Sequence, residues 1–472
     1  MRKSIYQDAK QKYAKYGIDV EKAIKKLGKV KISLQCWQLD DVQGFESNGP
    51  LTGGIQTTGN YPGKARNFEE ITQDLDKVLS YVPGSKKINL HAIYQVGDIV
   101  DRADVGPKQF EKWVEYAKSR NVGLDYNPTC FSSPMVKNGM TLSSPDENIR
   151  KYWIKHAINS RLVAEYFGKE LGQKSLCNLW IPDGLKDVPN DRIGPRQRLK
   201  ESLDEIFKVK VDHRYMDDSV ESKVFGIGVE SYTTGSHDFY LSYAMKNNVL
   251  CLLDTGHFHP TENVADKISS ILLFSPRLAF HVSRPVRWDS DHVLRLNDDL
   301  QEVANELVKC NALDRAYIGL DYFDASINRV AALALGARNM EKALLKALLT
   351  PWDLLKKYQD EEDFTSAGAS FLAKVEAAST GPFARVLKNF SATCGNIAYV
   401  RTSSSVPFPP AALEASTILS HSGSILSAGR HVITSVILFW ASACLTTSAF
   451  ASVGSLPNLP VTRLAKSAVI FS

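Results

Sequence analysis

Residues 249–257 read VLCLLDTGH, an unbroken apolar run that ends abruptly in an acid and a histidine. A strand covered on both faces needs such a continuous run, whereas a strand with one solvated face alternates apolar and polar residues. Strands covered on both faces are typical of parallel sheets, in which helices connect one strand to the next. The stretch therefore predicts a central strand of a parallel α/β sheet.

Seven further runs of this kind lie on either side of it. Between them are stretches of helical periodicity, such as residues 107–120 and 298–310. Eight strands alternating with helices predict a (β/α)8 TIM barrel. The eight predicted strand regions are 31–38, 87–94, 123–130, 176–183, 218–225, 249–257, 278–285 and 316–324.

The charge of the chain is not spread evenly. The 472 residues hold 57 Lys and Arg against 52 Asp and Glu, but six of the basic residues and one acid lie from Gly381 onward, which leaves 51 of each before it. A neutral body without a basic patch argues against nucleic acid as a partner. Residues 1–27 predict a charged N-terminal helix and lack the apolar core of a signal peptide. The seven cysteines include no CxxC pair and fit a reduced, cytoplasmic setting.

Composition changes near residue 369. Acids become scarce, Ser, Thr and Ala increase, and residues 432–462 carry no charged side chain. We therefore predict a barrel domain at 1–368 and an atypical Ser/Thr/Ala-rich tail at 369–472. Residues 432–450 are long enough to span a membrane. Their many Ser and Thr residues and the lack of basic flanks favour a disordered or aggregation-prone extension without membrane contact.

Polar residues gather where the apolar runs end, which in a TIM barrel is the face that carries the active site. A single Asp there is more often a turn or cap, and a single His more often a hydrogen-bonded core residue. Seven oxygen or nitrogen ligands from neighbouring strands are, however, enough for two divalent cations. Such carboxylate-rich, thiolate-free ligation favours Mn²⁺ or Mg²⁺, with Zn²⁺ or Co²⁺ able to compete. The seven are Glu221, Asp254, His257, His281, Asp289, Asp291 and Asp321.

Two of these acids are separated by one residue, in RWDSDH at 287–292. In an extended chain, residues i and i+2 face the same way, so Asp289 and Asp291 are predicted to hold one cation together. Four aromatic residues, Trp37, Phe131, Trp180 and Trp288, are either ordinary core or rim residues or an apolar wall for the C–H face of a sugar.

The Gly-rich stretch 51–67 ends in GKARN and has to be considered as a phosphate loop. It departs from that motif, because Thr58 stands where a glycine is needed and Ala65 replaces the hydroxyl that would contact Mg²⁺. We expect an ordered loop over the barrel mouth.

Several long motifs resemble bacterial L-rhamnose isomerase. The resemblance runs from about residue 5 to about residue 367 and ends before the tail. It implies a xylose-isomerase-like barrel, usually a homotetramer, that converts L-rhamnose to L-rhamnulose with two divalent cations, for which we predict Mn²⁺. The motifs are SLQCWQLDDVQGFE at 33–46, LTGGIQTTGNYPGKARN at 51–67, NLHAIY at 89–94, GIGVESYTTGS at 226–236, DTGHFHPTE at 254–262, HVSRPVRWDSDHV at 281–293 and IGLDYFDASINR at 318–329.

The resemblance also implies roles for particular residues. A mainly structural cation would be held by Glu221, Asp254, His281 and Asp321, and a catalytic cation by His257, Asp289 and Asp291. Glu230 remains an alternative to Glu221. Asp321 is expected to act in catalysis as well, and Lys223, His91 and Asp183 are expected to orient sugar hydroxyls or a water molecule.

The chemistry explains why such residues are needed. Moving a carbonyl from C1 to C2 requires the O2 proton to leave and a hydrogen to pass from C2 to C1. A cation polarises the carbonyl, and a dry pocket lets the hydrogen move as a hydride.

Three alternatives stay open at this stage. One is an isomerase for a related aldohexose or deoxyhexose. Another is a metal-dependent hydrolase on the same barrel, which the neutral charge disfavours. The third is a chain impaired by its tail, which a shift of reading frame in the coding sequence would explain.

Overall fold

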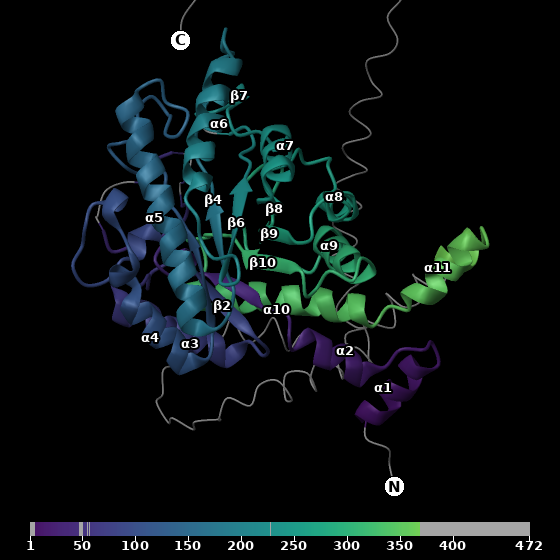
Figure 1. The fold of residues 1–472 in the computed structure, drawn as a ribbon. Coiled ribbons are helices and arrows are strands. Elements are labelled where there is room, and N and C mark those ends of the chain that lie inside the picture. Colours follow the sequence, from purple (N-terminus) through teal and green to yellow (C-terminus); the bar gives the residue numbers. More distant parts are fainter. Residues whose placement is uncertain (1–4, 47–50, 54, 56, 227, 369–472) are drawn as a thin grey trace, which may run out of the picture. The chain divides into compact units, whose positions relative to one another are not determined.

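The computed structural model describes residues 5–46, 51–53, 55, 57–226 and 228–368 (Figure 1). All of them belong to a unit that spans Met1–Ala398, which is distinct from Tyr399–Ser472. The predicted tail at 369–472, with its candidate membrane segment, lies outside the described residues. Among the described helices, none is long and apolar enough to cross a membrane.

Eight parallel strands form a closed barrel at the centre of the fold (Figure 1). Each strand pairs with its neighbours along the chain, and β1 closes the ring because Ile32 is in register with both Lys86 and Ile318. The predicted TIM barrel is thereby confirmed. The strands are β1 (Ile32–Gln35), β2 (Lys86–His91), β3 (Gly123–Asn127), β4 (Ser175–Leu179), β6 (Met216–Glu221), β8 (Leu250–Asp254), β9 (Leu278–Val282) and β10 (Ala316–Leu320).

Every predicted strand region overlaps one of these strands, and each strand is shorter than its region. Three strands, β2, β4 and β6, begin one or two residues before the region predicted for them. In 249–257, for example, β8 ends at Asp254, and His257 already lies in the following loop. The last residues of each region therefore turn away at the barrel mouth, where side chains from different strands can meet.

A helix follows each barrel strand and covers its outer face (Figure 1). Several of these helices begin at an asparagine whose side chain accepts a backbone N–H, as Asn67, Asn297 and Asn328 do. The helices are α3 (Phe68–Tyr81), α4 (Glu111–Arg120), α5 (Glu147–Leu171), α6 (Ile193–Lys208), α7 (His237–Asn247), α8 (Val264–Leu272), α9 (Asp298–Lys309) and α10 (Arg329–Leu348).

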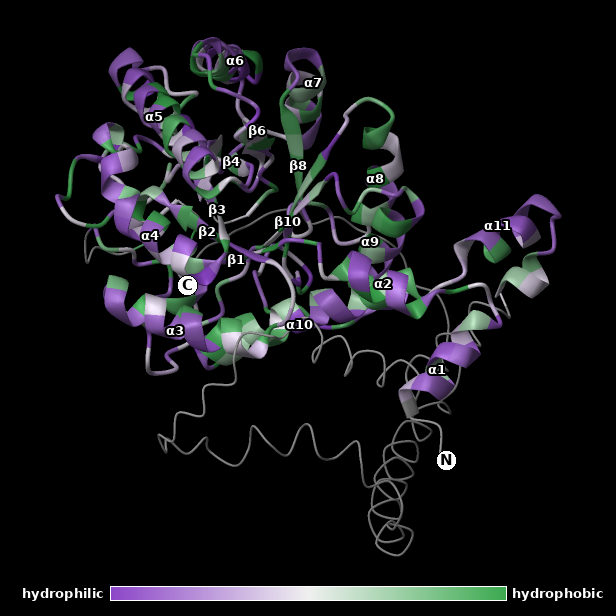
Figure 2. Cartoon of the chain, turned by 60° about the horizontal axis from the view of Figure 1, so that its bottom comes forward, coloured by the Kyte–Doolittle hydropathy of each residue, from purple (hydrophilic) through white to green (hydrophobic). Residues whose placement is uncertain are grey.

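The N-terminal region is two helices, not the single charged helix predicted for residues 1–27. They are α1 (Ile5–Ala14) and α2 (Val20–Leu27), and Gly17 between them has a left-handed backbone with φ of 76°. Asp19 begins α2 by accepting the N–H of Lys22. Figure 2 shows α1 as largely hydrophilic and β8 as apolar. In contrast to α1, α2 buries an apolar face of Val20, Ala23, Ile24 and Leu27.

The described chain also contains a small sheet, a last α-helix and four short 3-10 helices at Cys36–Leu39, Ala92–Tyr94, Arg102–Asp104 and Pro107–Phe110. A two-stranded antiparallel sheet pairs β5 (Gly184–Leu185) with β7 (Tyr232–Thr233). A last helix, α11 (Trp352–Asp360), follows α10 and has no buried residue.

The amino ends of the barrel strands carry buried charges, each of which has a partner. Lys87 on β2 forms an ion pair with Asp125 on β3. Arg161 on α5 donates two hydrogen bonds of 2.8 Å to the two oxygens of Asp218 on β6. A buried ion pair is tolerated when its geometry and remaining hydrogen bonds are good, and these pairs meet that condition.

Candidate metal centre

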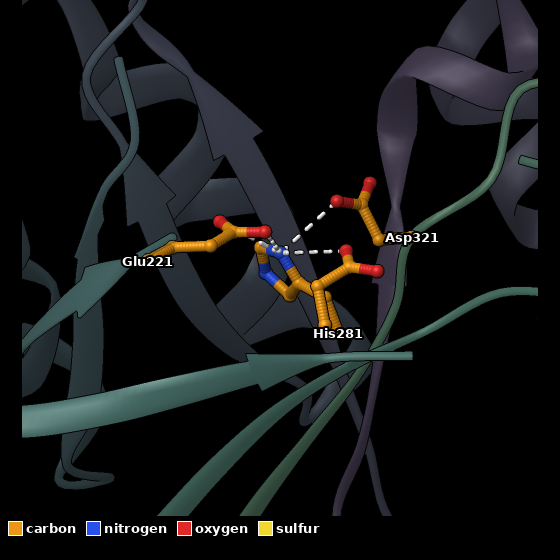
Figure 3. A group of neighbouring side chains, drawn as sticks. Glu221, His281 and Asp321 are labelled. Carbon is orange, nitrogen blue, oxygen red and sulfur yellow. Dashed lines mark hydrogen bonds and ion pairs between the residues drawn. The ribbon is translucent and has the colours of Figure 1, made fainter. Parts of the chain in front are cut away.

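At the carboxyl ends of four consecutive barrel strands, three acids surround one histidine (Figure 3). The Nδ1 atom of His281 on β9 lies 3.0 Å from Asp321 Oδ2 after β10 and 3.2 Å from Glu221 Oε2 on β6. It lies 4.0 Å from Asp254 Oδ2 at the end of β8. All four side chains are buried. The order of the strands in the barrel thus brings together residues that are up to 100 positions apart in the sequence.

A second group adjoins the first. His257 Nε2 lies 3.1 Å from Asp289 Oδ2, and His257 Nδ1 lies 3.3 Å from Glu221 Oε1. Each residue of a group offers one ligand atom within 4.8 Å of the others, and Asp254 belongs to both groups. The two groups therefore form one continuous cluster with Asp254 in common.

The chemistry of this cluster fits divalent cations. Four atoms of the cluster are buried and have no hydrogen-bond partner in the described part of the chain: Asp289 Oδ1, Asp321 Oδ1, His257 Nδ1 and His281 Nε2. Burial raises the pKa of the Asp254 carboxyl well above its usual range, and the neighbouring carboxylates raise that pKa further, against the opposing effect of His257. Buried carboxylates that face one another need a compensating positive charge, and carboxylate and imidazole groups are ligands for divalent metals.

Asp291 reaches the same region by a different route from the one predicted. The stretch around it is not extended, because Asp291 has a left-handed φ of 44°. Asp291 lines the cavity beside the cluster but belongs to neither group of candidate ligands. The loop that carries Asp289 and Asp291 is closed by a hydrogen bond of 2.9 Å from Arg284 N–H to the carbonyl of His292. The prediction of an extended Asp-Ser-Asp pair is therefore wrong in its backbone geometry.

The cluster opens into a cavity that five candidate ligands line, Glu221, His257, Asp289, Asp291 and Asp321. Its aromatic lining residues include Trp37, Phe131 and Trp180, three of the four residues predicted from the sequence, whereas Trp288 lines a different cavity. Ile55 lines it as well, which brings a described residue of the Gly-rich loop 51–67 to the cavity.

Two of the predicted polar residues line this cavity. The ring of His91 stacks on Trp37 with centroids 4.4 Å apart, and its Nε2 atom has no partner. Burial lowers the pKa of His91 to about 3, so the imidazole is neutral. Lys223 lies with its ammonium 5.3 Å from the ring centroid of Trp180, and burial lowers the pKa of Lys223.

The structure places two other candidate residues apart from the cluster. Asp183 is buried, does not line the cavity, and accepts hydrogen bonds from the backbone N–H groups and hydroxyls of Thr141 and Ser143. Its carboxylate thus holds the segment between β3 and α5. Glu230, the alternative to Glu221, is exposed.

The sequence reasoning missed a hydrogen-bond chain behind Glu221. Ser219 Oγ donates to Asn178 Oδ1 over 2.7 Å, and Asn178 Nδ2 donates to Glu221 Oε2 over 2.6 Å. Asn178 lies on β4, in the middle of the apolar run 176–183, and a polar residue inside such a run was the available signal.

Gly256 is a second residue that was missed. Its N–H donates to Asp254 Oδ1 over 2.6 Å. A Cβ atom at this position would lie 2.5 Å from Asp289 Oδ1, closer than any van der Waals contact allows. The backbone between the two candidate ligand residues Asp254 and His257 therefore has no room for a side chain.

Comparisons with known proteins agree with these features. A sequence profile of the L-rhamnose isomerase (RhaA) family matches residues 1–400, further along the chain than the resemblance by motifs. The L-rhamnose isomerases of Salmonella paratyphi B and Salmonella typhimurium are each 56% identical to this chain over 360 residues, which cover 76% of this chain and 86% of theirs. A solved structure of L-ribulose 3-epimerase aligns with a TM-score of 0.45 and 14% identity, covering 67% of this chain and 97% of that one. By the profile and by its identity to these relatives, the chain belongs to the L-rhamnose isomerase family.

Proposed function

We propose that this protein interconverts L-rhamnose and L-rhamnulose in a cation-dependent reaction. One observation carries the proposal: in a member of this family, a buried cluster of carboxylates and imidazoles with unpartnered atoms opens into a cavity with aromatic walls. A sugar offers vicinal oxygens to such a cluster and C–H faces to such walls.

We propose two cation positions. One would be held by Glu221, Asp254, His281 and Asp321, and the other by His257 and Asp289 with Asp254 near both. Asp291, which lines the cavity beside them, would complete the second position when a cation binds. Mn²⁺ is our first choice, because the donors are mostly carboxylate oxygens and include no thiolate, and Zn²⁺ or Co²⁺ could take its place. When bound, a divalent cation supplies Lewis-acid polarisation of the sugar carbonyl.

The residues around the cluster would orient the sugar. The neutral imidazole of His91 has one unpartnered nitrogen on the cavity side and can exchange a hydrogen bond with a hydroxyl group. The ammonium of Lys223 can donate to a sugar oxygen, and Asp321 Oδ1 is free to accept a hydroxyl proton. Because its oxygens already accept hydrogen bonds, we propose that Asp183 acts through the 141–143 segment and does not contact the sugar.

The walls determine how the hydrogen moves. Trp37, Phe131 and Trp180 exclude water from the space beside the cluster, so a hydrogen that leaves C2 has no solvent to exchange with. We propose that it passes to C1 as a hydride within the sugar, while the O2 proton is transferred separately to O1.

The test is ketose formation from L-rhamnose by purified protein, after chelation and again after Mn²⁺ is restored. Activity should vanish and return. A folded, metal-loaded protein without activity on L-rhamnose would contradict the assignment. A parallel reaction in D₂O should leave the C1 position of the product largely free of deuterium, and stoichiometric deuterium would show an enediol route.

We further propose a homotetramer in the cytoplasm. In the described part of the chain the cysteines are free, and four of the five are buried, which suits a reducing compartment. Light scattering after size-exclusion chromatography should give four times the mass of the 472-residue chain, and a monomer with full activity would exclude this assembly.

A further inference from the structure

A second cavity lies outside the metal centre, between the N-terminal ends of α8 and α9. Its empty volume is about 870 Å³. Asn263 and Asn297, the residues that cap α8 and α9, both line it, so the electropositive ends of two helices border the cavity. The loop that carries Asp289 and Asp291 contributes to both cavities: Arg284, Arg287 and Trp288 line this one, whereas Asp289 and Asp291 line the cavity beside the cluster.

The charge of this cavity is unbalanced. Three of its lining residues are arginines, Arg284, Arg287 and Arg295. Among the described residues, none of the three forms an ion pair; the one side-chain hydrogen bond is from Arg284 Nε to the carbonyl of Val293, at 3.1 Å. Burial and the neighbouring Arg295 lower the pKa of Arg284, against the opposing effect of Asp324, so the charges of Arg284 and Arg295 repel each other. An anion bound beside these guanidinium groups would relieve that repulsion.

The acids that line the cavity do not cancel this charge. Glu262 is already paired with Lys267, whose ammonium lies 2.7 Å from its carboxylate. Asp299 accepts a hydrogen bond of 3.0 Å from Asn297 and adds one negative charge. The residues that line the cavity therefore carry a net positive charge.

The floor of the cavity is apolar. Val264, Leu294, Leu300 and Val303 line it between the two helices. The exposed rim includes Trp288, which is 46% exposed. A ligand that fits both parts has an anionic group for the arginines and a carbon body for the floor.

We propose that this cavity is a binding site for a small phosphorylated organic molecule, separate from the sugar cavity. A phosphate group matches the arginines because guanidinium groups bind phosphate oxygens in pairs. A helix N-terminus is favourable for the same group. The carbon body covers the apolar floor, which inorganic phosphate alone cannot do.

The experiment is calorimetric titration of the full-length, Mn²⁺-loaded protein with phenyl phosphate, inorganic phosphate and phenol. We expect one phenyl phosphate per chain, bound at least about tenfold more tightly than inorganic phosphate, and no binding of phenol at the same concentrations. Absence of heat with millimolar phenyl phosphate would overturn the proposal.

Substitutions decide where the ligand binds. Arg295 is exposed and its side chain makes no hydrogen bond to any residue that the structure describes, so Arg295→Ala should fold and should weaken phenyl phosphate binding about tenfold or more. Arg295→Lys should retain part of the affinity. The matched control is Arg192→Ala, an exposed arginine at the start of α6 that does not line the cavity. Binding that Arg295→Ala leaves intact but Asp289→Asn abolishes would assign the anion to the metal centre and refute a separate site.

Discussion

The two ends of the barrel use the same types of charged residue in opposite ways. At the amino ends of the strands, each acid faces a base: Asp125 faces Lys87, and Asp218 faces Arg161. At the carboxyl ends, Glu221, Asp254 and Asp321 face one another around a single imidazole. The chain neutralises the first set with its own basic residues. The acids of the second set are left to be neutralised by a bound cation. Buried charge thus indicates stability at one end and ligand binding at the other.

The largest effect should come from removing one of the acids at the carboxyl ends of the strands, where the acids face one another. Glu221→Gln should lower activity by about 100- to 1000-fold, because it removes a carboxylate from a proposed cation site and bound cations supply several kcal/mol of charge stabilisation in such reactions. The measurement is ketose formation together with metal content by mass spectrometry. Glu230→Gln is the matched control, since Glu230 is exposed and should leave both unchanged. Equal losses of activity and of bound metal in Glu221→Gln and Glu230→Gln would contradict the assignment of Glu221 to the cation site.

Breaking an ion pair at the amino ends of the strands should lower the stability of the fold. Arg161→Met leaves the Asp218 carboxylate buried without its partner and should lower the free energy of unfolding by about 3–5 kcal/mol. Urea unfolding measures this, and activity per folded molecule should hardly change. Arg161→Met combined with Asp218→Leu should recover most of the loss. If Arg161→Met instead lost cation binding and kept its full stability, the two ends of the barrel would not have the separate roles described here.

The hydrogen-bond chain behind Glu221 predicts an intermediate effect. Asn178→Ala removes the donor to Glu221 Oε2 and should weaken Mn²⁺ binding by about 10- to 100-fold. Ser219→Ala, one hydrogen bond further away, should have a smaller effect in the same direction. Calorimetric Mn²⁺ titration measures this affinity, which would not change if Asn178 had a purely structural role. An unchanged Mn²⁺ affinity in Asn178→Ala would contradict a role for this hydrogen-bond chain in cation binding.

A gradual effect, spread over several pH units, concerns a buried acid that has partners of its own. Asp40 accepts hydrogen bonds of 2.6 Å from Tyr94 and from the N–H of Gly44, and burial raises its pKa to about 7. The unfolded chain ionises this group near pH 4, so its contribution to stability is present below pH 4 and is lost as pH rises to about 7. Asp40→Asn should flatten urea stability between pH 4.5 and 7 by at most about 1.4 kcal/mol per pH unit. A profile of unchanged slope would show that Asp40 is ionised throughout.

Much of the barrel could be predicted because each strand is buried on both faces and leaves a continuous apolar run. The candidate ligands could be predicted because they stand where those runs end. Asp183 could not be assigned in this way, since it also ends a run but is bound by Thr141 and Ser143, whose proximity depends on the folded chain. The prediction of an extended backbone at Asp291 was wrong for a related reason. The left-handed backbone of Asp291 depends on how the loop closes through Arg284.

Gly256 has a consequence for mutational surveys of this protein. In a saturation library, position 256 should tolerate substitution as poorly as a catalytic position, although glycine contributes no functional group. Any replacement, alanine included, pushes against the carboxylate of Asp289 and shifts one candidate ligand relative to the others. A map of intolerant positions would therefore mark a residue whose whole contribution is the space that it leaves empty.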